Sequence, residues 1–557
     1  MQKVKRGESL FWLDQLVDKI EKEKKLRKGQ TVTISCGWSA SGPIHIGNFR
    51  SDAIIPFFLG EILRERGYRV RNILIVYTQD RFKAKPSQLI FFENLREAEK
   101  HIGVPENYKP SSRLVEKYRN RRLADVPDPY ECCSSWAEHF AKEAIKTFAQ
   151  LGIKMEIITT EQFYKLDATK NLIKEIIEKR KKVINLLNQY RKTKPYPQDW
   201  QPINPLCPAC RNIADNKVLE IDAKKWKVRL RCSKCGKESE TSLENAKLDW
   251  KLEWAALWYV FNVTIEPYGK DHAAAGGSRD VCKELIAVLN KEPPFGFFSE
   301  WIGKIWQGHD LGDMTSSGNI LFTPKQFLEI APAEMLRYFY LWHESTRRFA
   351  FDFQQLQRYY DDYDTAERIC YGKEKVSEKE KADVVRAFKL AQLRKLPKKM
   401  FYQLPFSFAV MLIQLLPKQK VSFLLKSLGH IKKINKIEMY RINSRLDYAK
   451  NWLEKWAPEH YKIKIQKEIK EEIKEKLSDK EKKALLLLAE LITKKRKISE
   501  KALQSEMKKI CKKEKIEPKQ FFTAAYRVLL GKESGPRLST LIIVKKEEIA
   551  KLLKNLK

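Results

Sequence analysis

The fold of this chain is decided by the stretch Cys36-Gly37-Trp38-Ser39-Ala40-Ser41-Gly42-Pro43-Ile44-His45-Ile46-Gly47-Asn48. An apolar, β-branched run (31–35) precedes it, and an apolar-periodic segment (48–66) follows it. This order predicts a strand, a small-residue turn and a helix. The glycines let backbone approach a ligand, and the free N–H groups and dipole of the helix start favour an anion. The stretch therefore predicts a phosphate-binding loop, although an ordinary strand-to-helix connection has the same pattern.

A second strand completes the pattern. Residues 68–79 (Tyr-Arg-Val-Arg-Asn-Ile-Leu-Ile-Val-Tyr-Thr-Gln) predict it, so the order is strand, helix, strand. Such a unit favours a parallel sheet with a right-handed crossover, in which ligands bind at the carboxyl ends of the strands. The turn 39–43 falls at that edge. His45 lies at its mouth, where an imidazole can donate a hydrogen bond to charge that develops on a phosphate.

The composition indicates a strongly basic protein of several domains. A chain of 557 residues predicts two to four domains, and 43% hydrophobic residues suffice for sizeable cores. The formal net charge of +37 favours a polyanionic partner, most simply nucleic acid, although a generally lysine-rich proteome gives the same composition. There is no run of 18 apolar residues and no secretory signal, so we expect a cytoplasmic protein with no membrane partner.

Four of the ten cysteines form a metal-binding pattern. Cys207 and Cys210 precede Cys232 and Cys235 with the spacing Cys-x2-Cys-x21-Cys-x2-Cys, and a strand-like segment (226–231) lies between the pairs. A Pro-rich stretch (196–205) marks the start of this insertion. Four thiolates on two tight turns complete a tetrahedral zinc site and leave no ligand position open, so the pattern predicts structural Zn²⁺. Four unrelated thiols are the alternative.

We expect the sheet to resume after the insertion. The segment 250–254 (Trp-Lys-Leu-Glu-Trp) is dense in aromatic residues, and a later strand ends in Gly269-Lys270-Asp271-His272. An acidic residue after such a strand suits a ribose hydroxyl or an ammonium group, although a solvated turn also fits Lys270. Residues 120–195 have a mostly helical pattern. Residues 310–319 predict a small, polar, mobile loop. From residue 325 onward the pattern is helical almost to the end.

Together these blocks resemble class I lysyl-tRNA synthetase, a mainly archaeal family. The opening stretch is similar to that family's form of the His-Ile-Gly-His motif, which commonly ends in Asn, as His45-Ile46-Gly47-Asn48 does. Further blocks follow in the family's order: Val126–Tyr130 with Ser135–Phe140, the four cysteines, Glu266–His272, Pro332–Tyr338 and Tyr526–Leu538. The resemblance therefore spans nearly the whole chain.

The resemblance implies an α/β fold. A Rossmann-type catalytic domain would occupy 1–200 and 246–355, a zinc-bearing insertion 201–245, and an all-α anticodon-binding domain 356–557. It also implies that lysine reacts with ATP, bound with Mg²⁺, to give lysyl-adenylate, which then acylates tRNA(Lys). Such catalysis depends mostly on positioning and charge stabilisation.

The site residues implied by the resemblance fall into four groups. The catalytic group is His45, Asn48, Thr315, Ser316 and Ser317. The ATP-binding group is Ser41, Gly42, His45, Gly47, Asn48, Gly269, Asp271 and Met314, and the lysine-binding group is Gly37, Ser39, Trp250 and His272. A second zinc site would use Asp128, Cys132, Cys133 and His139, where the family's archaeal members carry Asp, Asp, His and His; a buried thiol pair beside a helix histidine is the alternative.

The chain departs from the family at its second motif. In place of Lys-Met-Ser-Lys-Ser or Lys-Met-Ser-Ser-Ser it has Asp313-Met314-Thr315-Ser316-Ser317. A lysine at the first position would neutralise the β- and γ-phosphates, whereas an aspartate is expected to repel them. Lys304 and Lys325 are the nearby lysines that could substitute. Other departures lie at Tyr77-Thr78-Gln79-Asp80, at Leu257, where an arginine is usual, and at Ala40, where a proline is usual.

Three functions remain open from the sequence. The first is an active lysine–tRNA ligase with a divergent loop, which His45, Asp271 and His272 favour. The second is a tRNA-binding paralogue that has lost lysine activation, which Asp313 favours. The third is a ligase for another amino acid, which the changes around the predicted lysine pocket favour.

Overall fold

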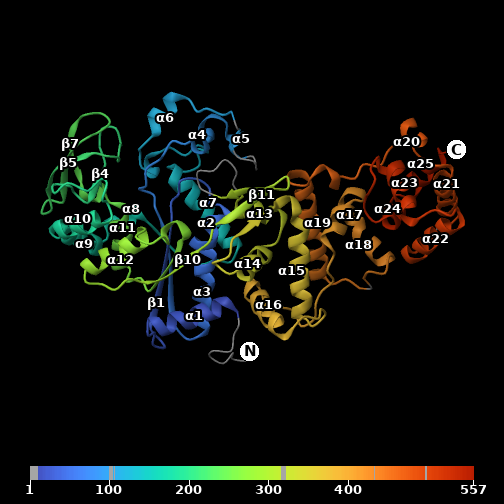
Figure 1. Ribbon diagram of the computed structural model, residues 1–557, viewed down its shortest axis with the longest axis horizontal. Coiled ribbons are helices and arrows are strands. Elements are labelled where there is room, and N and C mark those ends of the chain that lie inside the picture. Colours follow the sequence, from blue (N-terminus) through green and yellow to red (C-terminus); the bar gives the residue numbers. More distant parts are fainter. Residues whose placement is uncertain are drawn as a thin grey trace. The chain divides into compact units, whose positions relative to one another are not determined.

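The computed structural model describes residues 11–99, 104–105, 107–314, 322–431, 433–495 and 498–556. The chain forms two compact units (Figure 1). Unit 1 comprises Met1–Leu328, Pro332–Asp352 and Ala366–Pro397. Unit 2 comprises Glu329–Ala331, Phe353–Thr365 and Lys398–Lys557. Each unit is described separately below.

Unit 1 is built on a five-stranded parallel sheet with the order β10-β9-β1-β2-β3. The strands are β1 (Thr31–Trp38), β2 (Arg69–Val76), β3 (Glu156–Thr159), β9 (Ile265–Gly269) and β10 (Phe295–Ser299). In chain order this is the 3-2-1-4-5 arrangement of dinucleotide-binding folds, and the strand order reverses between β1 and β9. Ligands bind at such a reversal, beyond the carboxyl ends of the strands. The predicted Rossmann-type α/β fold is confirmed.

The predicted helix after the opening turn consists of three pieces. They are α2 (Ile46–Phe49), a π-helical turn η1 (Arg50–Ile54) and α3 (Ile55–Glu65). Pro56 has no N–H to donate to the carbonyl of Asp52, so the regular helix is interrupted there. The Cys36 thiol of β1 donates to that carbonyl instead, at 2.9 Å. A π turn is a common feature of functional sites, and this one places Asp52 beside the end of β1.

The insertion forms a small antiparallel sheet. Strands β5 (Lys217–Asp222), β6 (Lys227–Arg231) and β7 (Glu238–Ser242) pair in order, and β4 (Ile203–Pro205) pairs with β8 (Ala246–Leu248) where the insertion leaves and rejoins unit 1. The strand predicted over 226–231 is therefore present. Figure 1 shows these strands beside α8 (Thr160–Lys165), α9 (Asp167–Glu178) and α10 (Arg180–Gln189). Residues of the insertion and of these three helices share one apolar core.

The stretch 120–195 is mostly helical, as predicted, and it also holds β3, a four-residue edge strand that is too short to show a period. The aromatic segment 250–254 begins helix α11 (Trp250–Val260), whose consecutive residues Leu252–Trp258 are all buried, so it has no single apolar face. The loop predicted over 310–319 is wrong for its first residues. Residues 310–313 belong to β12 (His309–Asp313), a strand rather than a loop.

The remainder of unit 1 surrounds this sheet. Strand β12 pairs antiparallel with β11 (Ile302–Trp306), which also pairs parallel with β13 (Phe349–Phe351). The helices are α1 (Trp12–Glu23), α4 (Pro86–Glu93), α5 (Leu95–Ala98), α6 (Ser112–Tyr118), α7 (Trp136–Gln150), α12 (Ser278–Val288), α13 (Pro324–Ile330), α14 (Ala333–Trp342) and α16 (Glu378–Ala391). The end of α13 belongs to unit 2.

Unit 2 is helical wherever the structure describes it, as predicted. Its helices are α15 (Leu356–Cys370, of which the last residues belong to unit 1), α17 (Phe406–Leu415), α18 (Lys418–Ser427), α19 (Lys436–Lys455), α20 (Glu471–Glu475), α21 (Asp479–Lys494), α22 (Glu500–Lys513), α23 (Pro518–Leu530), α24 (Leu538–Val544) and α25 (Lys546–Lys554). In the described part of the chain no single helix meets the length and hydropathy needed to cross a membrane, and only the sharply bent pair α17–α18 meets them jointly.

Candidate functional site

A cavity of about 290 Å³ opens at the carboxyl ends of β1 and β9, where the strand order reverses. It brings together nine residues that the sequence analysis assigned to a site: Gly37, His45, Gly47, Asn48, Trp250, Gly269, Asp271, His272 and Met314. Ser39 and Ser41 line a neighbouring cavity of about 620 Å³, which shares Trp250 with the first. A Cβ at Gly42 would meet no heavy atom within 4 Å. Thr315, Ser316 and Ser317 lie outside the described residues.

His45 is held in one tautomer by the helix that it begins. It is the N-cap of α2, and its Nδ1 atom accepts the backbone N–H of Asn48 at 3.2 Å. An imidazole that accepts at Nδ1 carries its proton on Nε2. Burial and, to a smaller extent, the charge of Lys304 lower the pKa of His45 to about 3, so the ring is neutral at physiological pH. His45 is therefore a neutral N–H donor at the cavity wall.

Gly47 makes room for that ring. A Cβ at position 47 would lie 2.8 Å from Cε1 and 2.9 Å from Nδ1 of His45, which is closer than van der Waals contact allows. The Gly47 backbone has no unusual φ, so the requirement for glycine comes from the space above it. The glycine of the His-Ile-Gly-Asn stretch thus determines where the imidazole lies.

Two more glycines are needed for close packing at the cavity. A Cβ at Gly37 would lie 2.5 Å from Cε2 of Tyr77, so the Tyr77 ring lies directly against the backbone of β1. A Cβ at Gly269 would lie 2.5 Å from Oδ1 of Asp271. Both positions follow from the sheet, since Gly37 is near the end of β1 and Gly269 ends β9.

Aromatic rings form one wall of the cavity. The ring centroids of Trp250 and His272 are 5.2 Å apart with the rings nearly parallel, and Trp254 lies 5.2 Å from His272 at a steeper angle. Burial lowers the pKa of His272, so this ring too is neutral at physiological pH. Such a wall suits an aliphatic chain that ends in a cation.

Two carboxyl groups in the cavity, the half-buried Asp52 and the buried Glu266, were not predicted. Burial raises the pKa of Asp52 and that of Glu266 to about 7 each. Ser51 Oγ donates to Asp52 at 2.7 Å, and Trp254 Nε1 donates to Glu266 at 2.6 Å. Each of the two is a charged residue inside an apolar segment of the sequence, and this pattern could have indicated both. With Asp271 they make the cavity acidic and suited to an ammonium group.

Arg50 connects this cavity to the chain that follows the sheet. It is fully buried and donates to the carbonyl oxygens of Glu300 at 3.2 Å, Arg347 at 2.9 Å and His343 at 3.3 Å, and also to that of Glu344. Burial lowers the pKa of Arg50 to about 10, so it remains charged at neutral pH. One side chain of the π turn thereby fixes two loops, including the one that carries cavity residues Glu300 and Trp301.

The aspartate in the second motif is ion-paired. Arg348 Nε donates to Asp313 Oδ1 at 2.7 Å, and the same guanidinium binds both carboxylate oxygens of Asp310 at 2.9 and 3.1 Å. Arg348 therefore offsets part of the negative charge at this place, since one guanidinium is shared by two carboxylates, and the repulsion of phosphate by Asp313 stays a prediction. Of the two substitute lysines considered, Lys325 is ion-paired with Glu143, and Lys304 is buried, with its Nζ bonded to the Asp313 carbonyl oxygen at 3.2 Å.

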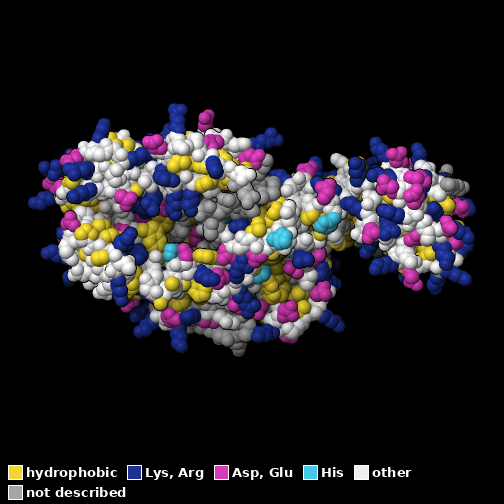
Figure 2. All heavy atoms as spheres, turned by 45° about the horizontal axis from the view of Figure 1, so that its top comes forward, with side chains coloured by type: hydrophobic (Ala, Val, Ile, Leu, Met, Phe, Trp, Pro, Cys, Tyr) yellow, Lys and Arg dark blue, Asp and Glu magenta, His cyan; other side chains and the backbone are white. Residues whose placement is uncertain are grey.

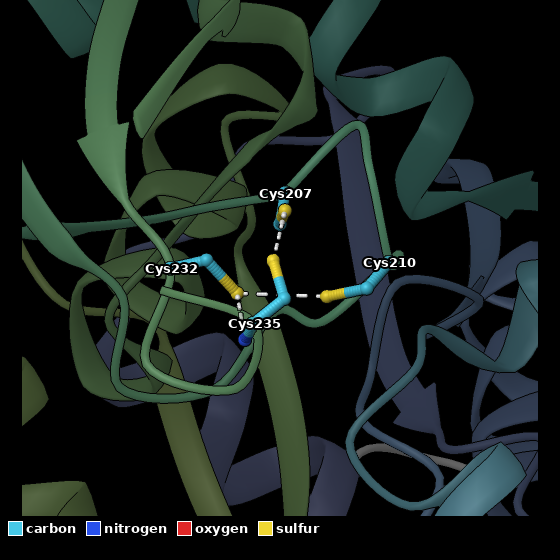
Figure 3. A group of neighbouring side chains, drawn as sticks. All are labelled: Cys207, Cys210, Cys232 and Cys235. Carbon is cyan, nitrogen blue, oxygen red and sulfur yellow. Dashed lines mark hydrogen bonds between the residues drawn. The ribbon is translucent and has the colours of Figure 1, made fainter. Parts of the chain in front are cut away.

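The four cysteines of the insertion converge on one point (Figure 3). Their Sγ atoms lie within 4.8 Å of one another, with Cys207–Cys235 at 3.8 Å and Cys210–Cys232 at 3.5 Å. Burial raises the pKa of Cys207 and that of Cys210, the latter to about 12, whereas the backbone N–H groups of Cys235 and Lys234 outweigh burial at Cys232 and lower its pKa to about 7. The close sulfur spacing is what a metal ion with four cysteine ligands requires.

The other predicted metal ligands also lie together. The ligand atoms of Asp128, Cys132, Cys133 and His139 lie within 4.8 Å of one another. His139 Nδ1 lies 3.2 Å from an oxygen of Asp128 and 3.3 Å from the sulfur of Cys132. The Asp128 carboxylate also accepts the backbone N–H groups of both cysteines, at 3.0 and 2.9 Å. This group can hold a metal ion as well.

A separate groove lies in unit 2 and was not predicted. It has a volume of about 980 Å³ and runs between α22 and α23. Exposed lysines line one side, the rings of Phe522 and Tyr526 line the other, and Arg537 lies at the rim. In the described part of unit 2 no carboxylate pairs with the three groove lysines, which are Lys508, Lys512 and Lys515. The groove is thus apolar inside and basic at its edge.

A Cβ at Gly535 would lie 2.8 Å from the Tyr526 ring, so this glycine lets the loop before α24 pack on the groove wall. Tyr526 donates to the Pro536 carbonyl oxygen at 2.5 Å. The Tyr526–Leu538 block that the sequence analysis singled out therefore builds one end of the groove.

Comparison with known proteins places this site in a family. The family described as "tRNA synthetases class I (K)" matches residues 10–394. The lysine–tRNA ligase of Aeropyrum pernix is 32% identical over 545 residues, which is 96% of this chain and 95% of that protein. Those of Pyrococcus horikoshii and Methanocaldococcus jannaschii are each 30% identical, over 544 and 549 residues, or 96% of this chain and 97% of each relative. The chain belongs to the class I (K) tRNA synthetase family.

Proposed function

We propose that this protein is a lysine–tRNA ligase, which activates lysine with ATP and transfers it to tRNA(Lys). The observation that carries the proposal is the single cavity at the strand reversal, in which the neutral N–H donor His45 faces the Gly269–His272 loop and an acidic, aromatic wall. Relatives that cover 96% of this chain bear the same name. The chemistry proposed below is assigned to these residues.

In the first step the carboxylate of lysine attacks the α-phosphorus of ATP, and pyrophosphate leaves. His45 Nε2–H donates to the phosphate oxygen on which charge develops, and the side chain of Asn48 contributes a further donor. Because the imidazole is already neutral and is already held by the backbone N–H of Asn48, it needs no reorganisation as the charge on the phosphate develops. In the second step a ribose hydroxyl of tRNA attacks the lysyl carbonyl, and AMP leaves.

The nucleoside and the amino acid would occupy neighbouring parts of the cavity. We assign adenosine and its ribose to Gly269 and Asp271, and the phosphates, with Mg²⁺, to the turn Ser41–Asn48. Thr315, Ser316 and Ser317 keep the catalytic role that the resemblance gives them. Lysine carries two ammonium groups, and the cavity offers Asp52 and Glu266 for them beside the wall of Trp250 and His272. Gly37 and Ser39 would border the same pocket.

The tRNA partner is supported by unit 2. We assign anticodon binding to this unit, and the groove between α22 and α23 suits an unpaired nucleotide, since its rings can stack on a base and its lysines can bind phosphates. Figure 2 shows Lys and Arg side chains spread over the drawn face of the molecule, with Asp and Glu among them, so the net charge of +37 supports a polyanionic partner without defining a patch.

We assign structural Zn²⁺ to the four insertion cysteines. A tetrahedral site with Zn–S bonds of 2.3 Å requires sulfur–sulfur distances of about 3.8 Å. The distances of 3.8 and 3.5 Å meet that requirement. We assign a second Zn²⁺ to Asp128, Cys132, Cys133 and His139, whose ligand types all bind zinc. All ten cysteines are free, which supports a reducing compartment such as the cytoplasm.

The test is ATP–pyrophosphate exchange with each of the twenty amino acids in turn. The proposal predicts exchange with lysine and at most weak exchange with the others. Exchange with a different amino acid would favour the third function considered from the sequence. No exchange with any amino acid, together with retained tRNA binding, would favour the tRNA-binding paralogue and overturn the proposal.

A further inference from the structure

A second cavity adjoins the one at the strand reversal. Its volume is about 620 Å³, and Trp250 lines both cavities. Its walls come from the turn after β1, the segment between β2 and α4, the insertion and the start of α11. Ligand pockets commonly measure about 300–1,000 Å³, so this cavity is large enough for a ligand of its own.

Gln79 lies in the second cavity with an unused acceptor. The residue is 2% exposed and lines the cavity, and its Oε1 atom has no hydrogen-bond partner among the described residues. Its backbone N–H is held by Thr160 Oγ1 at 3.1 Å. A buried amide oxygen without a partner is costly, so we expect a donor from a ligand to meet it. A carboxamide carries an acceptor and a donor side by side, which matches the edge of an adenine base.

One wall of the second cavity is basic. Arg81, Lys83 and Lys85 line it, and in the described part of the chain none of the three has an ion-pair partner. Burial and the charge of Lys83 lower the pKa of Lys85, so the two lysines act on each other. We call these three residues the basic wall. Adjacent cations without carboxylate partners favour phosphate groups.

The carboxylates that line the second cavity do not pair with the basic wall. Asp80 is ion-paired with Lys247 at 3.1 Å. Asp249 is the N-cap of α11, and Asp215 is exposed in the insertion. The second cavity therefore combines a buried amide, an aromatic ring shared with the first cavity and cations that are open to a ligand.

We propose that the second cavity receives the unpaired 3′-terminal nucleotide of tRNA, which is an adenosine. Gln79 pairs with the edge of the base, and the basic wall binds the phosphates that precede it. Trp250 lies between the base and the amino acid, so the terminal ribose reaches the first cavity where the two cavities meet. The inference rests on the proposed function, because it takes tRNA as the acceptor of lysine.

Binding of tRNA tests the basic wall without requiring activity. Dissociation constants are measured for a tRNA(Lys) transcript and for the same transcript without its last three nucleotides. The wild type should bind the complete transcript about tenfold more tightly. In Lys83→Met/Lys85→Met this ratio should fall to about twofold or less, because the lysines and the terminal phosphates act as one unit.

Lys224→Met/Lys225→Met is the matched control. It removes two exposed lysines of the insertion that do not line the second cavity, and it changes the net charge by the same amount. This control should keep the tenfold ratio even if general electrostatics weaken both transcripts. The affinity for ATP with Mg²⁺ should change by less than about twofold in Lys83→Met/Lys85→Met, because its phosphates are assigned to the first cavity.

The identity of the terminal base tests Gln79. Acylation kcat/KM is compared for transcripts that end in adenosine and in purine riboside, which lacks the 6-amino group. The wild type should prefer adenosine by about tenfold or more, and Gln79→Met, which has no amide, should lose most of this preference. Thermal melting shows whether the variant is folded.

Three results would overturn the proposal. The first is equal affinity of the wild type for the complete and the shortened transcript. The second is an unchanged ratio in Lys83→Met/Lys85→Met, and if ATP binding weakens in that variant, the second cavity holds the triphosphate instead. The third is a full preference for adenosine in Gln79→Met. No acylation by the wild type would contradict the proposed function, whereas the ratio of the two tRNA affinities still decides this inference.

Discussion

The Nδ1 atom of His45 accepts the backbone N–H of Asn48 at 3.2 Å, so this imidazole, which lines the cavity, also caps α2. The hydrogen bond that Nδ1 accepts determines which nitrogen of the ring can donate. Since Nδ1 is occupied as an acceptor, Nε2 carries the proton at neutral pH. The site is therefore prepared for an anion before one binds.

Gly47→Ala should disable this donor without unfolding the protein. The added Cβ would lie 2.8 Å from His45 Cε1 and force the ring away. We expect a loss of about 100- to 1,000-fold in the exchange kcat, the range seen when one transition-state donor is removed. Thermal melting shows whether folding is intact. In a His45→Ala background, Gly47→Ala should lower the exchange kcat little further. If it lowers kcat as much as it does in the wild type, Gly47 does not act by positioning His45.

Lysine binding should depend on pH through Asp52 and Glu266. Burial raises both pKa values to about 7, so each carboxyl group is protonated below that pH and charged above it. Because the charged forms bind ammonium, kcat/KM for lysine should rise as the pH increases from 6 to 8. The same profile for ATP at saturating lysine is the control and should be flatter. Asp52→Asn should lower kcat/KM for lysine, and its pH profile should then show the titration of one group instead of two. An unchanged pH profile of kcat/KM would exclude Asp52 from lysine binding.

Metal analysis should find two zinc ions per chain. Cys207→Ser and Cys132→Ala should each reduce that number by one, and only the first should make residues 203–248 sensitive to protease, because it removes the centre of the insertion. Cys370→Ser, a cysteine outside both groups, is the control and should retain both ions. Unchanged zinc content in Cys207→Ser would contradict the structural site.

The groove of unit 2 can be tested by charge reversal on one helix. Lys508→Glu/Lys512→Glu alters two groove lysines, and Lys509→Glu/Lys513→Glu alters two residues of α22 outside the groove, with the same spacing and net charge. The first pair should weaken tRNA binding about tenfold or more. It should also reduce the slope of log affinity against log salt concentration by the amount that about two phosphate contacts contribute. Lysine-dependent exchange should be unaffected. Equal weakening by both pairs would indicate general electrostatics instead of a groove.

Much of this site could be predicted from the sequence, for identifiable reasons. The strand, turn and helix around Gly42 depend on local letters, and the cysteine spacing defines a metal site almost by itself. Asp52 and Glu266 were missed although each is a charged residue inside an apolar segment, because the raised pKa that distinguishes them arises from burial in the fold. The ion pair of Asp313 with Arg348 was missed for a related reason, since it joins residues next to β12 and β13, which come together by pairing with β11. Helix α11 was not identified as a helix, because its consecutive buried residues show no helical period.

The most direct test of the account is the product formed on tRNA. A tRNA(Lys) transcript is incubated with the protein, ATP, Mg²⁺ and all twenty amino acids, and the aminoacyl ester is identified by mass spectrometry. The account predicts a lysyl ester on the terminal ribose, which His45→Ala reduces by about 100-fold or more. A different aminoacyl ester, or none while the tRNA remains bound, would contradict it.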